Sequence, residues 1–159
     1  MEITKYKISI TDDVKFGSNV KVVEPVNIYG SKIGDDCFIG PFVEIQKNTT
    51  IGDRTKVQSH SFICELVDIG ADCFIGHSVI FINDLFQSGR PSGGDYRKWK
   101  NTKIGNRVSI GSNATILAIN VCDDVVIGAG SVVTKNIIEK GIYAGNPAVK
   151  LRNIWNLKI

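Results

Sequence analysis

A large apolar residue recurs at every sixth position from Ile33 to Phe81, and this period constrains the fold more than any other feature of the chain. The positions are Ile33, Ile39, Ile45, Ile51, Val57, Ile63, Ile69, Ile75 and Phe81. Fixed self-similarity of this kind indicates a repeat architecture. A period of six fits neither an α-helix nor a coiled coil. It fits a short strand followed by a corner, with three repeats closing one triangular coil.

The same period resumes on both sides of this run. Upstream it includes Ile10, Phe16, Val22 and Ile28, and downstream it includes Ile104, Ile110, Ile116, Val121, Ile127 and Val133, with one residue lost on each side. We therefore predict an all-β fold, a parallel β-helix of about seven coils with inward aliphatic files. Its coils should pair through their backbones at roughly 4.8 Å. We expect a single domain over residues 1–159.

Composition narrows the class of protein. A net charge of +3 is too small to predict a nucleic-acid partner, and no apolar run reaches membrane-spanning length. The N-terminus lacks the shape of a signal peptide, so we expect a cytoplasmic protein with no membrane partner. Cys37 and Cys73 are predicted in one inward file about 10 Å apart, too far for a disulfide. A solenoid has a thin core, which favours oligomerisation.

Residues 82–103 interrupt the period with a long loop. This loop contains turn-forming Gly, Pro and Ser, three aromatic residues and several basic ones, including Phe86, Arg90, Tyr96, Arg97, Lys98, Trp99, Lys100 and Lys103. Loops of this length in compact domains are usually functional. The mixture suits a phosphate-bearing ligand with a stackable ring. The alternative is a solvated excursion without a role.

The two histidines of the chain, His60 and His77, precede this loop. Being seventeen residues apart, they are predicted to lie on neighbouring coils at almost the same angle and to face outward. Asn83 and Asp84 follow one corner later, at the root of the loop. Either the histidines are incidental surface residues or at least one is catalytic. Because zinc catalysis generally needs three protein ligands, we expect no metal.

The C-terminal segment, residues 146–159, is predicted to cap the solenoid. Asn146 and Pro147 have the pattern of a helix cap and first-turn residue, which predicts a short helix through Trp155. Basic residues surround it, namely Lys140, Lys150, Arg152 and Lys158. Such an end can hold a phosphate or simply seal the solenoid, and the two roles are compatible.

The hexads, the segment GAGSVVTKN (128–136) and the motif GNPA (145–148) together resemble the hexapeptide acyltransferases. This resemblance implies a left-handed β-helix, usually a trimer, that uses acetyl-CoA. A narrower likeness comes from KVQSHSFIC (56–64), FIGHSVIFIND (74–84), the long loop and IGSNATIL (110–117). These resemble bacterial N-acetyltransferases of nucleotide-linked amino sugars, which act on dTDP-3-amino-3,6-dideoxyhexoses or UDP-3-amino uronic acids for O-antigen and S-layer glycans.

The resemblance also implies the partners and the site residues. It predicts a homotrimer with active sites between subunits, a nucleotide-linked amino sugar and coenzyme A as ligands, and no metal. The implied catalytic residues are His77, Asn83 and His60, with His77 preferred as the base. Implied sugar contacts are Glu44, Asp84, Arg90, Tyr96 and Trp99. Implied coenzyme A contacts are Ser109, Gly111, Ala114, Ala129, Lys135, Pro147, Lys150 and Arg152. The stretch AINVCDD (118–124) is one residue shorter than the family pattern.

Two other functions fit the same repeats. One is O-acetylation of a small alcohol or sugar, which requires a base to activate a hydroxyl, so that loss of the histidine abolishes activity. The other is a non-catalytic scaffold, against which the paired histidines and the basic tail argue. A scaffold would show no thermal shift with coenzyme A.

Overall fold

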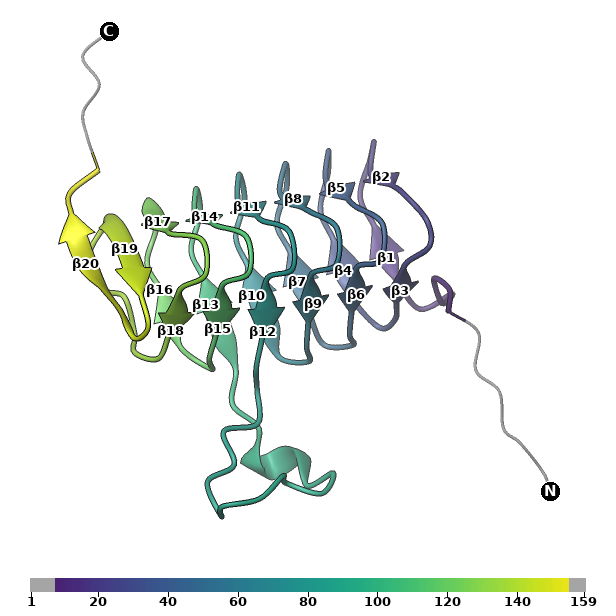
Figure 1. Ribbon diagram of the computed structural model, residues 1–159. Helices are drawn as coiled ribbons and strands as arrows, with labels where there is room; N and C mark the ends of the chain where they lie inside the picture. Colours follow the sequence, from purple (N-terminus) through teal and green to yellow (C-terminus); the bar gives the residue numbers. More distant parts are fainter. Residues whose placement is uncertain (1–7, 155–159) are drawn as a thin grey trace, which may run out of the picture.

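The computed structural model describes residues 8–154 as a three-sided parallel β-solenoid of about seven turns (Figure 1). Each side is one sheet. The first sheet contains β1 (Lys15–Phe16), β4 (Lys32–Ile33), β7 (Thr50–Ile51), β10 (Val67–Ile69), β13 (Thr102–Ile104) and β16 (Asn120–Val121). The second contains β2 (Lys21–Val22), β5 (Phe38–Ile39), β8 (Lys56–Val57), β11 (Phe74–Ile75), β14 (Ser109–Ile110) and β17 (Val125–Ile127), then β19 (Gly141–Gly145) and β20 (Ala148–Arg152). The third contains β3 (Asn27–Ile28), β6 (Glu44–Ile45), β9 (Phe62–Ile63), β12 (Ile80–Phe81), β15 (Thr115–Ile116) and β18 (Val132–Val133).

The predicted aliphatic files form the core. Along the first sheet, Ile33 pairs with Ile51, Ile51 with Ile69 and Ile69 with Ile104, all in parallel register. These side chains are buried, as are the equivalent ones in the other two sheets from Ile28 onward, whereas in the first coil Phe16 is 40% exposed and Ile10 and Val22 are half-buried. Because a strand alternates its side chains between faces, the preceding residue in each strand points outward. The six-residue period therefore predicted the fold and its register correctly.

We name the three edges of the solenoid by their residues. The aspartate corner joins the first sheet to the second (residues 34–36, 52–54, 70–72, 105–107 and 122–124). The histidine corner joins the second to the third (residues 40–42, 58–60, 76–78, 111–113 and 128–130). The loop corner joins the third back to the first (residues 29–31, 46–48, 64–66, 82–101, 117–119 and 134–136).

At the aspartate corner, carboxylates cap the backbone of the neighbouring coil. Asp53 accepts the backbone N–H of Asp35 at 2.9 Å, and Asp123 accepts that of Asn106 at 2.9 Å. The glycine before each capped residue is required by this contact, since a Cβ on Gly34 would lie 2.3 Å from an Asp53 carboxylate oxygen. A structural requirement therefore explains the acidic residues of this edge.

The long loop leaves the solenoid after β12 and returns at β13, so the predicted interruption is confirmed, although the strand already resumes at Thr102. The loop projects from the loop corner and carries a single 3-10 turn, η1 (Tyr96–Lys98) (Figure 1). The Asp95 carboxylate caps this turn by accepting the backbone N–H of Arg97.

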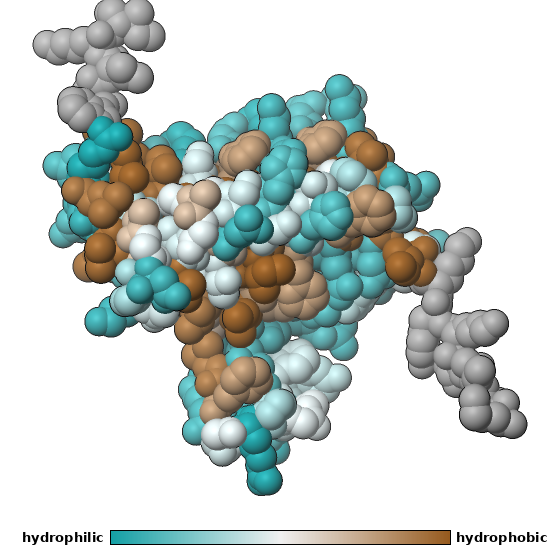
Figure 2. Space-filling view, in the orientation of Figure 1, coloured by the Kyte–Doolittle hydropathy of each residue, from teal (hydrophilic) through white to brown (hydrophobic). Residues whose placement is uncertain are grey.

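The predicted C-terminal helix is wrong. Residues 141–152 instead form the antiparallel hairpin β19–β20, with Asn146 and Pro147 in its turn, and β19 adds to the second sheet beside β17. Pro147 lies between the strands, where its missing N–H costs no ladder bond. The end of the predicted helix, from Trp155, lies outside the described residues. Exposed apolar side chains gather at this end of the solenoid, including Ile138, Val149 and Leu151 (Figure 2).

Candidate functional site

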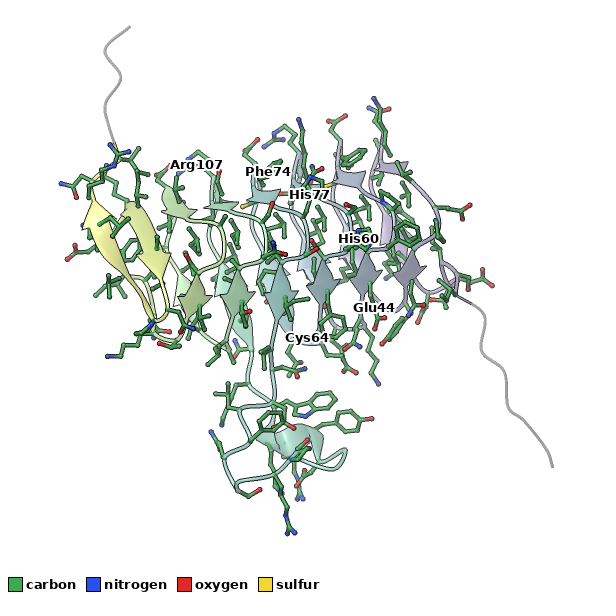
Figure 3. All side chains as sticks on the ribbon, in the orientation of Figure 1. Glu44, His60, Cys64, Phe74, His77 and Arg107 are labelled. Atoms are coloured by element: carbon green, nitrogen blue, oxygen red, sulfur yellow. The ribbon has the colours of Figure 1, made fainter. Side chains whose placement is uncertain are left out.

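The predicted catalytic residues occupy two corners that flank the third sheet. His60 and His77 lie at the histidine corner, whereas Asn83 and the loop lie at the loop corner, one strand further along the chain (Figures 1 and 3). The strand β12 separates the two groups within one subunit. The structure therefore places the two histidines on neighbouring coils of one corner but does not bring His77 to Asn83.

His77 is held by a side chain of the preceding coil. Its Nδ1 lies 2.8 Å from the hydroxyl oxygen of Ser59, and the residue is exposed. When Nδ1 carries the proton, it donates to this hydroxyl, and Nε2 is then an acceptor. The geometry can thus present a basic nitrogen at the surface of the corner.

His60 has a different environment. The pairing of β8 with β11 stacks His77 over Ser59, so His60 lies one residue beyond Ser59 on the neighbouring coil, as the spacing of seventeen residues predicted. The His60 ring instead stacks on Phe42, with centroids 4.8 Å apart. His60 also adopts a left-handed backbone conformation, with φ of 64°. His60 is therefore an exposed residue that packs on an aromatic ring.

Small residues continue the histidine corner beyond His77. The backbone N–H of Asn113 donates to the carbonyl of His77, and that of Gly130 donates to the carbonyl of Ser112. Gly111 and Ala129, both predicted as coenzyme A contacts, lie on this edge, and Ala129 is exposed. Such a track leaves room for a narrow ligand along the corner.

Other predicted coenzyme A contacts lie elsewhere. Ser109 is in β14, and the Ala114 side chain is 0% exposed. Ala114 faces the core because it lies two residues before the inward Ile116, so its side chain cannot line an outer surface. Lys135 and Pro147 are exposed at two different places, the loop corner and the hairpin turn.

The basic C-terminal hairpin contains an ion pair. The Lys150 ammonium lies 2.9 Å from the Glu139 carboxylate, which raises the pKa of Lys150 and lowers that of Glu139. A hollow of about 720 Å³ opens beside them, lined by Asp124, Glu139, Lys140, Lys150, Asn153 and Ile154. Arg152 lies in β20 and is exposed. Part of the predicted positive charge is therefore balanced within the protein.

Asn83 closes the root of the loop. The residue is 9% exposed, and its side-chain amide donates to the backbone carbonyl of Glu65 at 3.1 Å. Its own carbonyl accepts the backbone N–H of Lys100 at 2.9 Å, which joins the two arms of the loop. Asn83 thus has a structural role that the sequence did not reveal.

Polar residues that are buried or half-buried continue from Asn83 along the loop corner. Gln46 accepts the backbone N–H of Glu65 at 3.2 Å and donates to the Glu44 carboxylate at 2.9 Å. Burial raises the pKa of Tyr29, and the charges of Glu44 and Glu65 raise it further. Glu65 and Gln46 were not predicted, yet a spacing of eighteen residues connects Lys47, Glu65 and Asn83. That spacing could have pointed to Glu65 from Asn83, whereas no such spacing pointed to Gln46.

The loop organises its own side chains. The Asp84 carboxylate accepts the backbone N–H groups of Ser92 at 2.7 Å and Phe86 at 3.0 Å, and these bonds lower its pKa. The Trp99 indole N–H donates to the Ser92 hydroxyl at 2.7 Å, and its ring meets Tyr96 edge to face. Arg90 is exposed. Tyr96 and Trp99 therefore form a preorganised aromatic pair.

A further groove lies on the outer face of the second sheet. Its volume is about 740 Å³, and its lining is Asn19, Lys21, Asp36, Cys37, Phe38, Lys56 and Gln58. Within residues 8–154 there is no group of three metal-ligating side chains and no helix that could cross a membrane.

Two protein-family models and a group of curated relatives match this chain. Residues 30–65 match the family "bacterial transferase hexapeptide (six repeats)", and residues 101–135 match "hexapeptide repeat of succinyl-transferase". The bifunctional protein GlmU of Trichodesmium erythraeum is 31% identical over 157 residues, covering 98% of this chain. The chain spans 31% of the length of that relative.

Solved structures share the solenoid. A variant of AntD, an N-acyltransferase from Bacillus cereus in complex with dTDP and coenzyme A, matches with a TM-score of 0.75 at 21% identity, over 87% of this chain and 82% of that one. A galactoside acetyltransferase in complex with coenzyme A matches with a TM-score of 0.68 at 29% identity, over 79% of this chain and 66% of that one. The chain thus carries hexapeptide repeats over residues 30–65 and 101–135 and shares the three-sided parallel solenoid of these structures.

Proposed function

We propose that this protein transfers an acetyl group from acetyl-CoA to the amine of a nucleotide-linked amino sugar, with a dTDP-3-amino-3,6-dideoxyhexose as the preferred class. The observation that carries this proposal is the exposed His77, oriented by Ser59 at the start of a track of small residues. Its biological setting would be bacterial surface-glycan synthesis in the cytoplasm.

The track beside His77 fits the pantetheine arm of coenzyme A. Ser112 and Ala129 continue the corner with short side chains, so a narrow chain can lie along it and bring its thioester to the imidazole. The hairpin that carries Lys150 and Arg152 lies at the same end of the solenoid, where it would meet the phosphates. Ala114 is not part of this proposal, because its side chain is in the core.

The chemistry needs little from the protein. The thioester is already activated, so the site must align the amine, accept one proton and stabilise one oxyanion. The amine attacks the carbonyl carbon, and the tetrahedral intermediate expels the thiolate of coenzyme A. His77 Nε2 takes the ammonium proton and passes it to that thiolate. Ser59 would hold the imidazole in the required tautomer.

A second copy of the chain would complete the site. The outward side chains of the first sheet are exposed and mostly charged, as at Lys32, Asp68 and Lys103. The third sheet is less charged, since its outward side chains are all half-buried and Phe62, Ile80 and Val132 among them form an apolar stretch beside the polar Asn27, Glu44 and Thr115. A homotrimer that covers this apolar stretch would bring the loop of one subunit toward the histidine corner of the next. Tyr96 and Trp99 would then contact the nucleotide.

The solved neighbours support this class. AntD is an N-acyltransferase bound to dTDP and coenzyme A, so the same solenoid accommodates both ligand types there. The galactoside acetyltransferase supports the alternative acceptor, a sugar hydroxyl. One panel of acceptors that contains both nucleotide-linked amino sugars and galactosides can therefore separate N-acetylation from O-acetylation.

The test is a screen of acetyl-CoA with dTDP- and UDP-linked 3- and 4-amino sugars, galactosides and serine, read by release of free coenzyme A. We expect turnover with at least one nucleotide-linked amino sugar, and an N-acetyl product by mass spectrometry. Turnover confined to a galactoside or serine would establish O-acetylation instead. A thermal shift with coenzyme A should accompany either result. The absence of both the thermal shift and turnover would indicate a scaffold.

A further inference from the structure

The carboxylate of Glu65 is placed where a charge is costly. The residue is only 8% exposed, and the neighbouring groups on its own backbone are already bonded, the N–H to Gln46 and the carbonyl to Asn83. A buried carboxylate requires a cationic or hydrogen-bonding partner. The cation present is the Lys47 ammonium, 3.8 Å away on the preceding coil.

The same ammonium contacts the loop. Lys47 Nζ lies 5.3 Å from the centroid of the Tyr96 ring, within the range of a cation–π interaction. Tyr96 begins the 3-10 turn of the loop and packs edge to face against Trp99. Lys47 thus joins a buried residue of the solenoid to the aromatic pair of the loop.

The loop otherwise depends on its own bonds and on its root. Asp84, Ser92 and Trp99 hold its interior, and Asn83 with Lys100 closes its base. These contacts fix the shape of the loop but not its tilt relative to the solenoid. A contact distant from the root, such as that between Lys47 and Tyr96, restricts that tilt.

We propose that Lys47 is a positioning residue of the loop: by pairing with Glu65 and lying over the Tyr96 ring, it sets the orientation of the aromatic pair that meets the nucleotide. This rests on the proposed function for the identity of the ligand, but the clamp itself is a property of the chain. It predicts an effect on the binding of the sugar nucleotide and none on acetyl-CoA.

The test compares four variants. Lys47→Met removes the ammonium, and Tyr96→Leu removes the ring while keeping the Lys47–Glu65 pair intact. Lys47→Arg and Tyr96→Phe are matched controls, since a guanidinium and a phenyl ring retain the interaction. Because Lys47→Met leaves Glu65 unpaired and can affect folding, Tyr96→Leu provides the independent variant.

The first measurement is the rate of tryptic cleavage after Arg97 and Lys98, which requires no substrate; Arg90 precedes Pro91 and is not a trypsin site. We expect cleavage about fivefold faster in Lys47→Met and in Tyr96→Leu, and within about twofold of wild type in the two controls. Wild-type rates in both apolar variants would overturn the proposal. So would acceleration in Lys47→Met alone, because it would trace the effect to the unpaired Glu65.

The second measurement is steady-state kinetics on the amino sugar that wild type turns over. We expect KM for that sugar to rise about fivefold in both apolar variants, with kcat and the KM of acetyl-CoA within about twofold of wild type. A fall in kcat of about fivefold with an unchanged KM for the sugar would contradict a positioning role. If wild type acetylates no amino sugar, the proposed function fails, while cleavage still decides the clamp.

Discussion

Replacing Ile75 by alanine tests whether the aliphatic files hold the solenoid together. Ile75 is 0% exposed and pairs with Val57 on one side and Ile110 on the other. The substitution removes three carbons, each worth about 0.8 kcal/mol in transfer from water. The neighbouring coils are fixed by backbone bonds and cannot close the gap, so a cavity term adds to this. We expect a loss of about 3–4 kcal/mol in the free energy of unfolding.

The assay is urea unfolding followed by circular dichroism at one fixed protein concentration, because association would alter the apparent stability. Lys56→Ala is the matched control, since Lys56 is the outward, exposed residue of the adjacent strand β8. We expect that control to cost less than about 0.5 kcal/mol. A loss below about 1.5 kcal/mol for Ile75→Ala, or equal losses for both variants, would show that the aliphatic files do not hold the solenoid together.

Three further outcomes follow from the corners and the core. Arg54 lowers the pKa of Asp72 through a hydrogen bond, so this pair stabilises the fold above the ordinary carboxyl pKa, and the contribution is lost as pH falls through the lowered value. Asp72→Asn should therefore flatten the dependence of stability on pH below about 4. An unchanged profile would contradict this. A Cβ on Gly111 would lie 2.4 Å from the backbone nitrogen of Ala129, so Gly111→Ala should sharply lower the yield of folded protein on size exclusion. A normal elution profile would argue against tight stacking of the coils. Burial raises the pKa of Cys64 to about 12, so Cys64 should resist a thiol reagent at pH 8 until the protein is unfolded, and rapid labelling would show that this corner opens.

The sequence predicted the fold well because the solenoid has one simple geometric rule. Each hexad places its first residue inward, so the aliphatic files from Ile33 to Val133 could be read without knowing any contact. The interruption after Phe81 was equally visible. The hairpin at the C-terminus was missed because Asn146–Pro147 satisfies both a helix start and a turn. The alternation of Val149, Lys150 and Leu151 was the competing signal, and backbone pairing with β17 decided in its favour.

The site was less predictable because its contacts depend on register to a single residue. The spacing of seventeen residues placed His60 and His77 on neighbouring coils, but it did not show that Ser59, eighteen residues before His77, contacts the imidazole. The same count, applied to Asn83, leads back to Glu65 and Lys47. Ala114 shows the opposite limit: a small residue near the expected cofactor track proved to face the core.

The most direct measurement is the rate of acetyl transfer from acetyl-CoA to the nucleotide-linked amino sugar by wild type, His77→Ala and His60→Ala. We expect turnover by wild type, a fall in kcat of about 10²-fold or more for His77→Ala, and a change of less than about threefold for His60→Ala. Equal rates for wild type and His77→Ala would contradict the role of the Ser59-oriented imidazole. Absence of any N-acetylated product from wild type would contradict the proposed function itself.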